Sequence, residues 1–160
     1  MLKKEDNVKT TEATVEGLEI VTTKATELKK TEFFKMLAGT EEGLVLTIDR
    51  VGKVFKSKYS NDKGIYPSGC FIDYTFTKNS KDYEVGIYYN LGVPTAEGSF
   101  ILNSNMNVFK IINVATDLAE AEEIKVTEEF IQNTLAGTTF LAEVGTSYNG
   151  GFLIEPVEKL

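Results

Sequence analysis

Basic and aromatic side chains come together in one segment of the chain, from Arg50 to Lys63. Its cations are Arg50, Lys53, Lys56, Lys58 and Lys63, and its one carboxylate is Asp62. The segment therefore has a net charge of +4, whereas the whole chain of 160 residues has a net charge of −7. Lysine and arginine bind phosphates, and exposed aromatic rings stack on unpaired bases. The segment is typical of a site for single-stranded nucleic acid, although the acidic total argues against one.

The residues that could bind nucleic acid extend beyond this segment. The candidate set is Lys53, Phe55, Lys56, Lys58, Tyr59, Lys63, Tyr66, Phe71, Tyr88 and Tyr148. Tyr59 and Tyr66 belong to the loop that follows the basic strand, and the last of the set lies at the tip of the final hairpin. Phe55, Phe71 and Tyr88 are included because alternation along their strands places them opposite the expected core residues. The alternatives are core or cross-strand packing for the aromatics, and a solvated, aggregation-resistant edge for the lysines.

The residue types that most often catalyse reactions or bind metals are scarce. The chain has no His, the commonest general base and metal ligand. Its single cysteine, Cys70, allows neither an internal disulfide nor a zinc cluster, and we expect it in the core. The 24 Asp and Glu residues form no recognisable ligand motif, which leaves a carboxylate-dependent hydrolase as the enzymatic alternative. We expect no enzymatic activity, no metal and no cofactor.

The elements that would carry the candidate residues are mostly strands. Alternating apolar residues predict a long strand over residues 42–60, in which Gly52 indicates a bend. After a loop over residues 60–69, strands are predicted over residues 70–77 and 82–90, joined by a short polar hairpin turn. The core-facing residues of this hairpin are predicted to be Ile72, Tyr74, Phe76, Tyr83, Val85, Ile87 and Tyr89.

Helical segments and a final hairpin follow. Ser104 or Asn105 can cap a helix that carries an apolar stripe, and Thr127 can cap a second helix that ends at Gly137. Strands over residues 138–145 and 151–157 are joined by a turn that contains an Asn-Gly pair. The acidic stretch over residues 117–129 has six carboxylates against one lysine. We expect this stretch to be a solvated linker and the start of a helix.

The order of these elements predicts the fold class. Residues 1–16 are predicted to be a flexible N-terminal tail, and residues 17–160 a single domain that begins with a strand over 17–23 and a helix over 24–38. Three strands, a helical insertion and two strands then follow, which is the order of the five-stranded OB barrel. We therefore predict a mainly β, OB-fold-like barrel. It has a helical insertion between strands 3 and 4 and an N-terminal strand and helix extension.

Two stretches of the sequence also resemble a known class of proteins. LAGTTFLAEVGTSYNGGFLIEPV and the bent strand EGLVLTIDRVGKVFKSKYS are similar to the closing hairpin and the first strand of OB-fold single-stranded-DNA-binding proteins of Gram-positive phages and conjugative plasmids. The resemblance covers residues 40–160 and lies in the order of elements and a few turn residues. It implies sequence-independent binding of single-stranded DNA, or of RNA, in the replication, recombination or transfer of a mobile genetic element.

A second function class remains open at this point. A protein-interaction or structural module of a phage or plasmid, without nucleic-acid binding, would fit the acidic total and a tail that docks on a neighbour. In either case we expect a homo-oligomer, assembled through that N-terminal tail. No apolar run is long enough to span a membrane, and the N-terminus does not have the pattern of a secretory signal. The sequence therefore predicts a cytoplasmic location.

Overall fold

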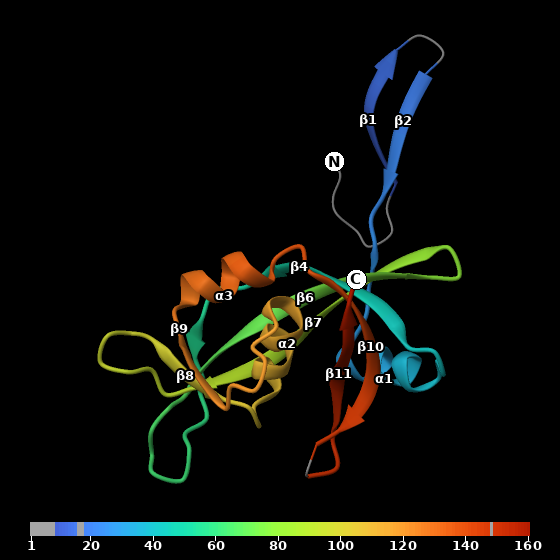
Figure 1. The fold of residues 1–160 in the computed structure, drawn as a ribbon. Coiled ribbons are helices and arrows are strands. Elements are labelled where there is room, and N and C mark those ends of the chain that lie inside the picture. The colour runs from blue at the N-terminus through green and yellow to red at the C-terminus, as the bar shows by residue number, and fades with distance from the viewer. Residues whose placement is uncertain (1–8, 16–17, 148) are drawn as a thin grey trace.

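The computed structural model describes residues 9–15, 18–147 and 149–160. Within these ranges the chain is mainly β, with three helices (Figure 1). None of the helices in the described ranges is long and apolar enough to cross a membrane.

Five long strands form most of the main sheet. They are β4 (Leu44–Val51), β6 (Ser68–Lys78), β7 (Lys81–Gly92), β10 (Thr139–Thr146) and β11 (Phe152–Lys159). Their order in the sheet is β11-β10-β4-β6-β7, and each pairs antiparallel with its neighbour. Two short strands complete the sheet, β3 (Thr26–Glu27), which runs parallel to β7, and β5 (Phe55–Lys56), which pairs with β6. The sheet is therefore mixed.

The predicted closed barrel is not found among the described residues. β11 lies at one end of the sheet and β3 at the other, and no strand ladder of the described chain joins the two ends. Helix α1 (Lys30–Ala38) instead contacts both β7 and β10. Phe33 of this helix contacts Phe76 of β6, and Phe34 stacks against Phe152 of β11. Side-chain packing by a helix therefore connects the two sides of the sheet where strand pairing would close a barrel.

The alternation of apolar residues predicted the buried faces of the strands. The buried set includes Leu44, Leu46, Ile48, Ile72, Tyr74, Phe76, Val85, Ile87 and Tyr89, with Tyr83 partly buried against it. The predicted hairpin between β6 and β7 is confirmed. Its two turn residues, Asn79 and Ser80, have φ angles of 54° and 64°, the left-handed conformation that a two-residue hairpin loop requires.

The chain between β7 and β10 forms the predicted helical insertion. It consists of β8 (Phe100–Asn103), α2 (Asn107–Thr116), β9 (Glu123–Val126) and α3 (Glu128–Leu135). Helix α3 begins at the predicted cap, because the Thr127 hydroxyl accepts a hydrogen bond from Phe130 N at 3.0 Å. Helix α2 begins after Met106 rather than at Ser104 or Asn105. Those two residues belong to a turn in which Asn105 N donates to Asn103 Oδ1 at 2.9 Å.

The acidic stretch before α3 contains a strand that the sequence did not predict. β9 pairs antiparallel with β8, so that Phe100 lies opposite Val126 and Leu102 opposite Ile124. Phe100, Leu102 and Val126 are buried, and Ile124 is partly buried. The prediction of a solvated linker is therefore wrong for this part, because alternate residues of the stretch pack into the core.

A separate hairpin precedes α1. β1 (Lys9–Val15) and β2 (Leu18–Thr23) pair with each other and project away from the main sheet (Figure 1). β2 confirms the strand predicted at this position, whereas β1 forms where the sequence predicted a flexible tail. Residues 1–8 and 16, also assigned to that tail, lie outside the described residues. Helix α1 begins later than predicted because Thr26 and Glu27 pair with β7.

Candidate functional site

Three exposed aromatic rings lie together on the outer face of β5, β6 and β7, opposite the core. The ring centroids of Phe71 and Tyr88 are 5.6 Å apart, and Phe55 lies 6.0 Å from Phe71 and 5.9 Å from Tyr88. Phe55 and Phe71 are stacked with an angle of 17° between their planes. The exposed fractions are 43% for Phe55, 46% for Phe71 and 38% for Tyr88. We call these three residues the aromatic cluster.

Backbone pairing and one glycine place the three rings side by side. Phe71 lies directly opposite Tyr88 in the β6–β7 ladder, and Phe55 lies opposite Gly69 in the β5–β6 ladder. A Cβ on Gly69 would run into the Tyr88 ring. Gly69 therefore lets the tyrosine ring lie close against the sheet, beside Phe55. Partial burial raises the pKa of the Tyr88 phenol, and its hydrogen bond with Ser57 acts in the opposite direction.

The predicted cations continue from the aromatic cluster into the connection between β4 and β6. We call residues 52–67, which include β5, the basic loop. The side chains of Lys53, Lys56, Lys58 and Lys63 are all exposed. Tyr59 is 72% exposed, and the Lys58 Nζ atom lies 5.9 Å from the centre of its ring. Tyr66 is also exposed. The loop thus presents positive charge and open aromatic surface together.

Side-chain hydrogen bonds give the far end of the basic loop a defined conformation. The Asn61 Oδ1 atom accepts hydrogen bonds from Lys63 N at 2.9 Å and from Ile65 N at 3.0 Å. Asn61 N in turn donates to Ile65 O at 2.7 Å. These bonds close a compact turn, as asparagine side chains commonly do. The turn places Lys63 and Tyr66 on an ordered segment.

The same sheet face becomes acidic directly beside the aromatic cluster, where Asp73 lies opposite Gly86 in the next outward-facing pair of the β6–β7 ladder. A hollow of about 250 Å³ there is lined by Glu27, Asp49, Arg50, Asp73, Thr75, Glu84, Val85 and Gly86. Arg50 Nε donates a hydrogen bond to Asp73 Oδ2 at 2.8 Å, so these two charges offset each other. The remaining carboxylates among the lining residues give the hollow an excess of negative charge. Burial, and next to it the charge of Glu27, raises the pKa of Glu84. Among the described residues no three potential metal ligands are grouped closely enough to hold an ion. This part of the face would repel a polyanion.

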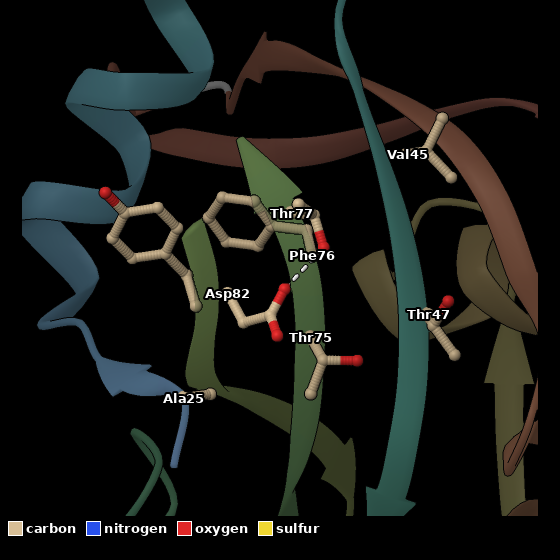
Figure 2. A pocket seen from close by; sticks show the side chains of 8 residues that line it. Ala25, Val45, Thr47, Thr75, Phe76, Thr77 and Asp82 are labelled. Carbon is tan, nitrogen blue, oxygen red and sulfur yellow. Dashed lines mark hydrogen bonds between the residues drawn. The ribbon is translucent and has the colours of Figure 1, made fainter. Parts of the chain in front are cut away.

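A second, larger hollow of about 450 Å³ lies farther along the sheet (Figure 2). Thr47 of β4 and Thr75 and Thr77 of β6 line it, and Thr77 Oγ1 donates a hydrogen bond to Asp82 Oδ1 at 2.7 Å. Phe76 and Tyr83 form another part of the wall. No cation is among the lining residues. The hollow has neither the charge nor the exposed rings of the basic loop.

The structure places the candidate residues in two groups. Phe55, Phe71 and Tyr88 meet in the aromatic cluster, so the cross-strand packing that the sequence offered as an alternative is present, although each ring stays partly exposed. The exposed Lys53, Lys56, Lys58, Tyr59, Lys63 and Tyr66 lie in the basic loop. Tyr148 lies outside the described residues.

One residue that builds the site was not singled out from the sequence. The sequence pattern places Gly69 in a loop rich in turn residues, whereas in the structure it lies in β6 beside the cluster. A glycine directly before an aromatic-rich strand can indicate a close approach by a neighbouring ring. That signal was present in the sequence.

Comparison of the chain with protein-family models, with curated proteins and with solved structures finds no match. The function must therefore be argued from the geometry of the site.

Proposed function

We propose that the chain binds single-stranded DNA, or RNA, without sequence specificity. The observation that carries the proposal is the aromatic cluster Phe55, Phe71 and Tyr88 at the root of a basic loop in an acidic chain. Every base has a face on which an aromatic ring can stack, so stacking does not depend on sequence. The lysines of the basic loop would contact the phosphates.

The order of the strands supports the same proposal. Along the chain, three long strands, a helical insertion and two long strands follow one another, and β4 pairs with both β6 and β10. We propose that this is an open form of the OB arrangement, in keeping with the sequence resemblance to phage and plasmid proteins. In OB folds, oligonucleotides bind the face of strands 2 and 3 and the loop after strand 1. The corresponding parts here are β6, β7 and the basic loop.

The acidic hollow defines the path that the strand would take. A nucleic acid that ran along the whole outer face of β6 and β7 would meet Asp49, Asp73 and Glu84. A path from the aromatic cluster into the basic loop avoids these carboxylates and follows the lysines instead. We therefore propose that the bound nucleic acid crosses β5 and continues along the basic loop.

Fluorescence anisotropy with a labelled oligo-dT tests the proposal directly. We expect binding at low salt, with a log–log salt slope of roughly −2 to −3.5 for three to five phosphate contacts. Oligo-U and duplex DNA of equal length, used as competitors, report the preference for DNA and for single strands. No binding of oligo-dT at low salt would show that the proposal is wrong.

A pair of charge reversals localises the site. Lys56→Glu combined with Lys58→Glu should abolish binding at moderate salt, because both cations lie in the basic loop. The matched control is Lys29→Glu combined with Lys30→Glu, two exposed residues at the start of α1. The control changes the net charge equally, and the N-terminal end of a helix tolerates acids. Equal loss of affinity in both variants would indicate a general charge effect and move the site elsewhere.

The projecting β1–β2 hairpin favours a second candidate, a module that assembles with a neighbouring subunit. An isolated two-stranded hairpin is marginally stable in water, so a partner would stabilise it. Removal of residues 1–23 keeps β3, whose Thr26 and Glu27 pair with β7. Light scattering after size exclusion should then show a loss of oligomers relative to the full chain. An unchanged molecular mass would remove the support that the hairpin gives to this candidate.

A further inference from the structure

The connection that joins β4 to β5 is held from two sides. On one side, Gly52 N donates a hydrogen bond to Phe71 O at 2.8 Å, which ties the connection to β6. On the other side, Val54 N donates to Glu128 Oε2 at 2.9 Å, and Gln132 Nε2 donates to Gly52 O at 3.3 Å. Glu128 and Gln132 belong to α3, more than seventy residues away in the sequence. The helical insertion therefore contacts the first residues of the basic loop.

The side chains of Glu128 and Gln132 on α3 also contact each other. They are four residues apart, on the same side of the helix, and Gln132 Nε2 lies 3.4 Å from Glu128 Oε2. The helix beneath them is anchored by Ile131 and Leu135, which are 1% and 0% exposed. The charge of Glu128 also lies close to β6, since it adds to the effect of burial in raising the pKa of Cys70 to about 11.

This contact bears on the position of Phe55. Only residues 52–54 separate β4 from Phe55, and the β5 ladder beyond them has two residue pairs, Phe55 with Gly69 and Lys56 with Ser68. A ladder this short contributes little on its own, so the bonds to Gly52 and Val54 matter for holding the Phe55 ring against Phe71 and Tyr88.

We propose that Glu128 and Gln132 are positioning residues of the nucleic-acid site, through which α3 holds the basic loop and Phe55 ready for binding. This inference rests on the proposed function. A ring that is already in place loses less freedom when a base stacks on it, and the bound state is stabilised accordingly. Neither residue needs to contact the nucleic acid.

The charge of Glu128 makes the inference separable from simple electrostatics. A carboxylate near a polyanion site weakens binding, so its removal alone should increase affinity. Glu128→Gln removes the charge and keeps an oxygen that can accept from Val54 N. Glu128→Ala removes the charge and the acceptor together. The comparison of these two variants therefore isolates the hydrogen bond, and Glu129→Ala, an exposed neighbour, controls for charge on the helix.

The experiment measures oligo-dT affinity, thermal stability and hydrogen exchange at the Val54 amide in each variant. Glu128→Ala should weaken binding and accelerate Val54 exchange by about tenfold each, as expected for loss of a hydrogen bond to a charged group. Gln132→Ala should also weaken binding. Glu128→Gln and Glu129→Ala should retain wild-type affinity or exceed it. Thermal stability should change little in Glu128→Ala, because the core residues of α3 remain.

The outcomes distinguish the two proposals. If the wild-type chain fails to bind oligo-dT, the proposed function is wrong and the positioning role falls with it. If the wild-type chain binds and Glu128→Ala binds as tightly as Glu128→Gln, only the positioning role is overturned. If Val54 exchange is unchanged in Glu128→Ala while affinity falls, Glu128 acts by another route, and the positioning role is likewise overturned.

Discussion

The β6–β7 hairpin carries two aromatic clusters, one on each face, that differ in almost every physical respect. On the inner face, Tyr74 and Tyr89 are 0% and 5% exposed, and their hydroxyl groups are 2.7 Å apart. On the outer face, Phe71 and Tyr88 pack against Phe55 and keep more than a third of their surface open. Tyr88 and Tyr89 are neighbours in the sequence. Strand alternation alone sends one ring to the core and the other to solvent.

The difference separates stability from binding. The inner tyrosines bury their rings and satisfy each other's hydroxyl groups, as buried polar groups must. Folding removes less of the surface of the outer rings from water. These rings gain only cross-strand contacts, which are worth a fraction of a kcal/mol to about 1 kcal/mol each. We therefore expect the inner cluster to carry much of the stability of the hairpin and the outer cluster to be available for a ligand.

The largest expected effect comes from the inner cluster. Tyr74→Ala should lower the free energy of unfolding by about 3–5 kcal/mol. The substitution leaves a cavity and removes the hydrogen-bond partner of the buried Tyr89 hydroxyl. Urea denaturation followed by circular dichroism measures the change. The matched variant on the outer face, Tyr88→Ala, should lose less than half as much. Similar losses in the two variants would contradict the division between the faces.

Alkaline pH tests the same contrast without a cavity. Burial raises the pKa of both Tyr74 and Tyr89 well above its usual value. The folded state therefore holds these protons more tightly than the unfolded chain. Their contribution to stability is fully present below about pH 9 and falls as the pH rises past 10, by about 1.4 kcal/mol per pH unit for each group.

Denaturation at pH 9, 10 and 11 measures this slope. Tyr74→Phe removes one titrating group and should reduce the slope markedly. Tyr88→Phe should reduce it less, because its ring is 38% exposed. A wild-type stability that is flat up to pH 11 would show that folding does not raise the pKa values of the inner phenols.

The outer cluster should show the opposite balance between stability and binding. Phe71→Ala should weaken oligo-dT binding by about 1–3 kcal/mol, the usual value of one base stack, and lower the free energy of unfolding by about 1 kcal/mol or less. Phe152→Ala is the control, since Phe152 is a 55% exposed aromatic that stacks on Phe34 of α1, away from the cluster. Equal affinity of wild type and Phe71→Ala would exclude this ring from the site.

Local patterns in the sequence predicted which side chains face outward, but not that they meet. Alternation placed Phe55, Phe71 and Tyr88 opposite the core, because the period of a strand is a property of a few consecutive residues. Their contact depends on the registers that set Phe55 opposite Gly69 and Phe71 opposite Tyr88, and those involve separate strands.

The features that the sequence did not predict correctly also involve distant parts of the chain. The β8–β9 pair joins Phe100 to Val126 across the whole of α2, and the bond from Val54 N to Glu128 joins two elements that no local pattern connects. The predicted closed barrel required pairing between strands far apart in the sequence, and α1 packs between the sides of the sheet instead. Periodicity carries no information on such long-range pairings.

The smallest expected effect concerns the boundary between the aromatic cluster and the acidic hollow beside it on the outer face. Arg50 and Asp73 form an ion pair at 2.8 Å with side chains 71% and 30% exposed, and such pairs contribute about 0–1 kcal/mol to stability. Arg50→Gln and Asp73→Asn should therefore both leave the free energy of unfolding nearly unchanged.

The effects of these two variants on oligo-dT affinity should have opposite signs. Arg50→Gln removes a cation and leaves Asp73 uncompensated, whereas Asp73→Asn frees Arg50 for phosphate. Anisotropy titrations at low salt, where such charges are least screened, measure both. A decrease of affinity in both variants would mean that the pair serves to shape the face, and that charge does not set the boundary of the site.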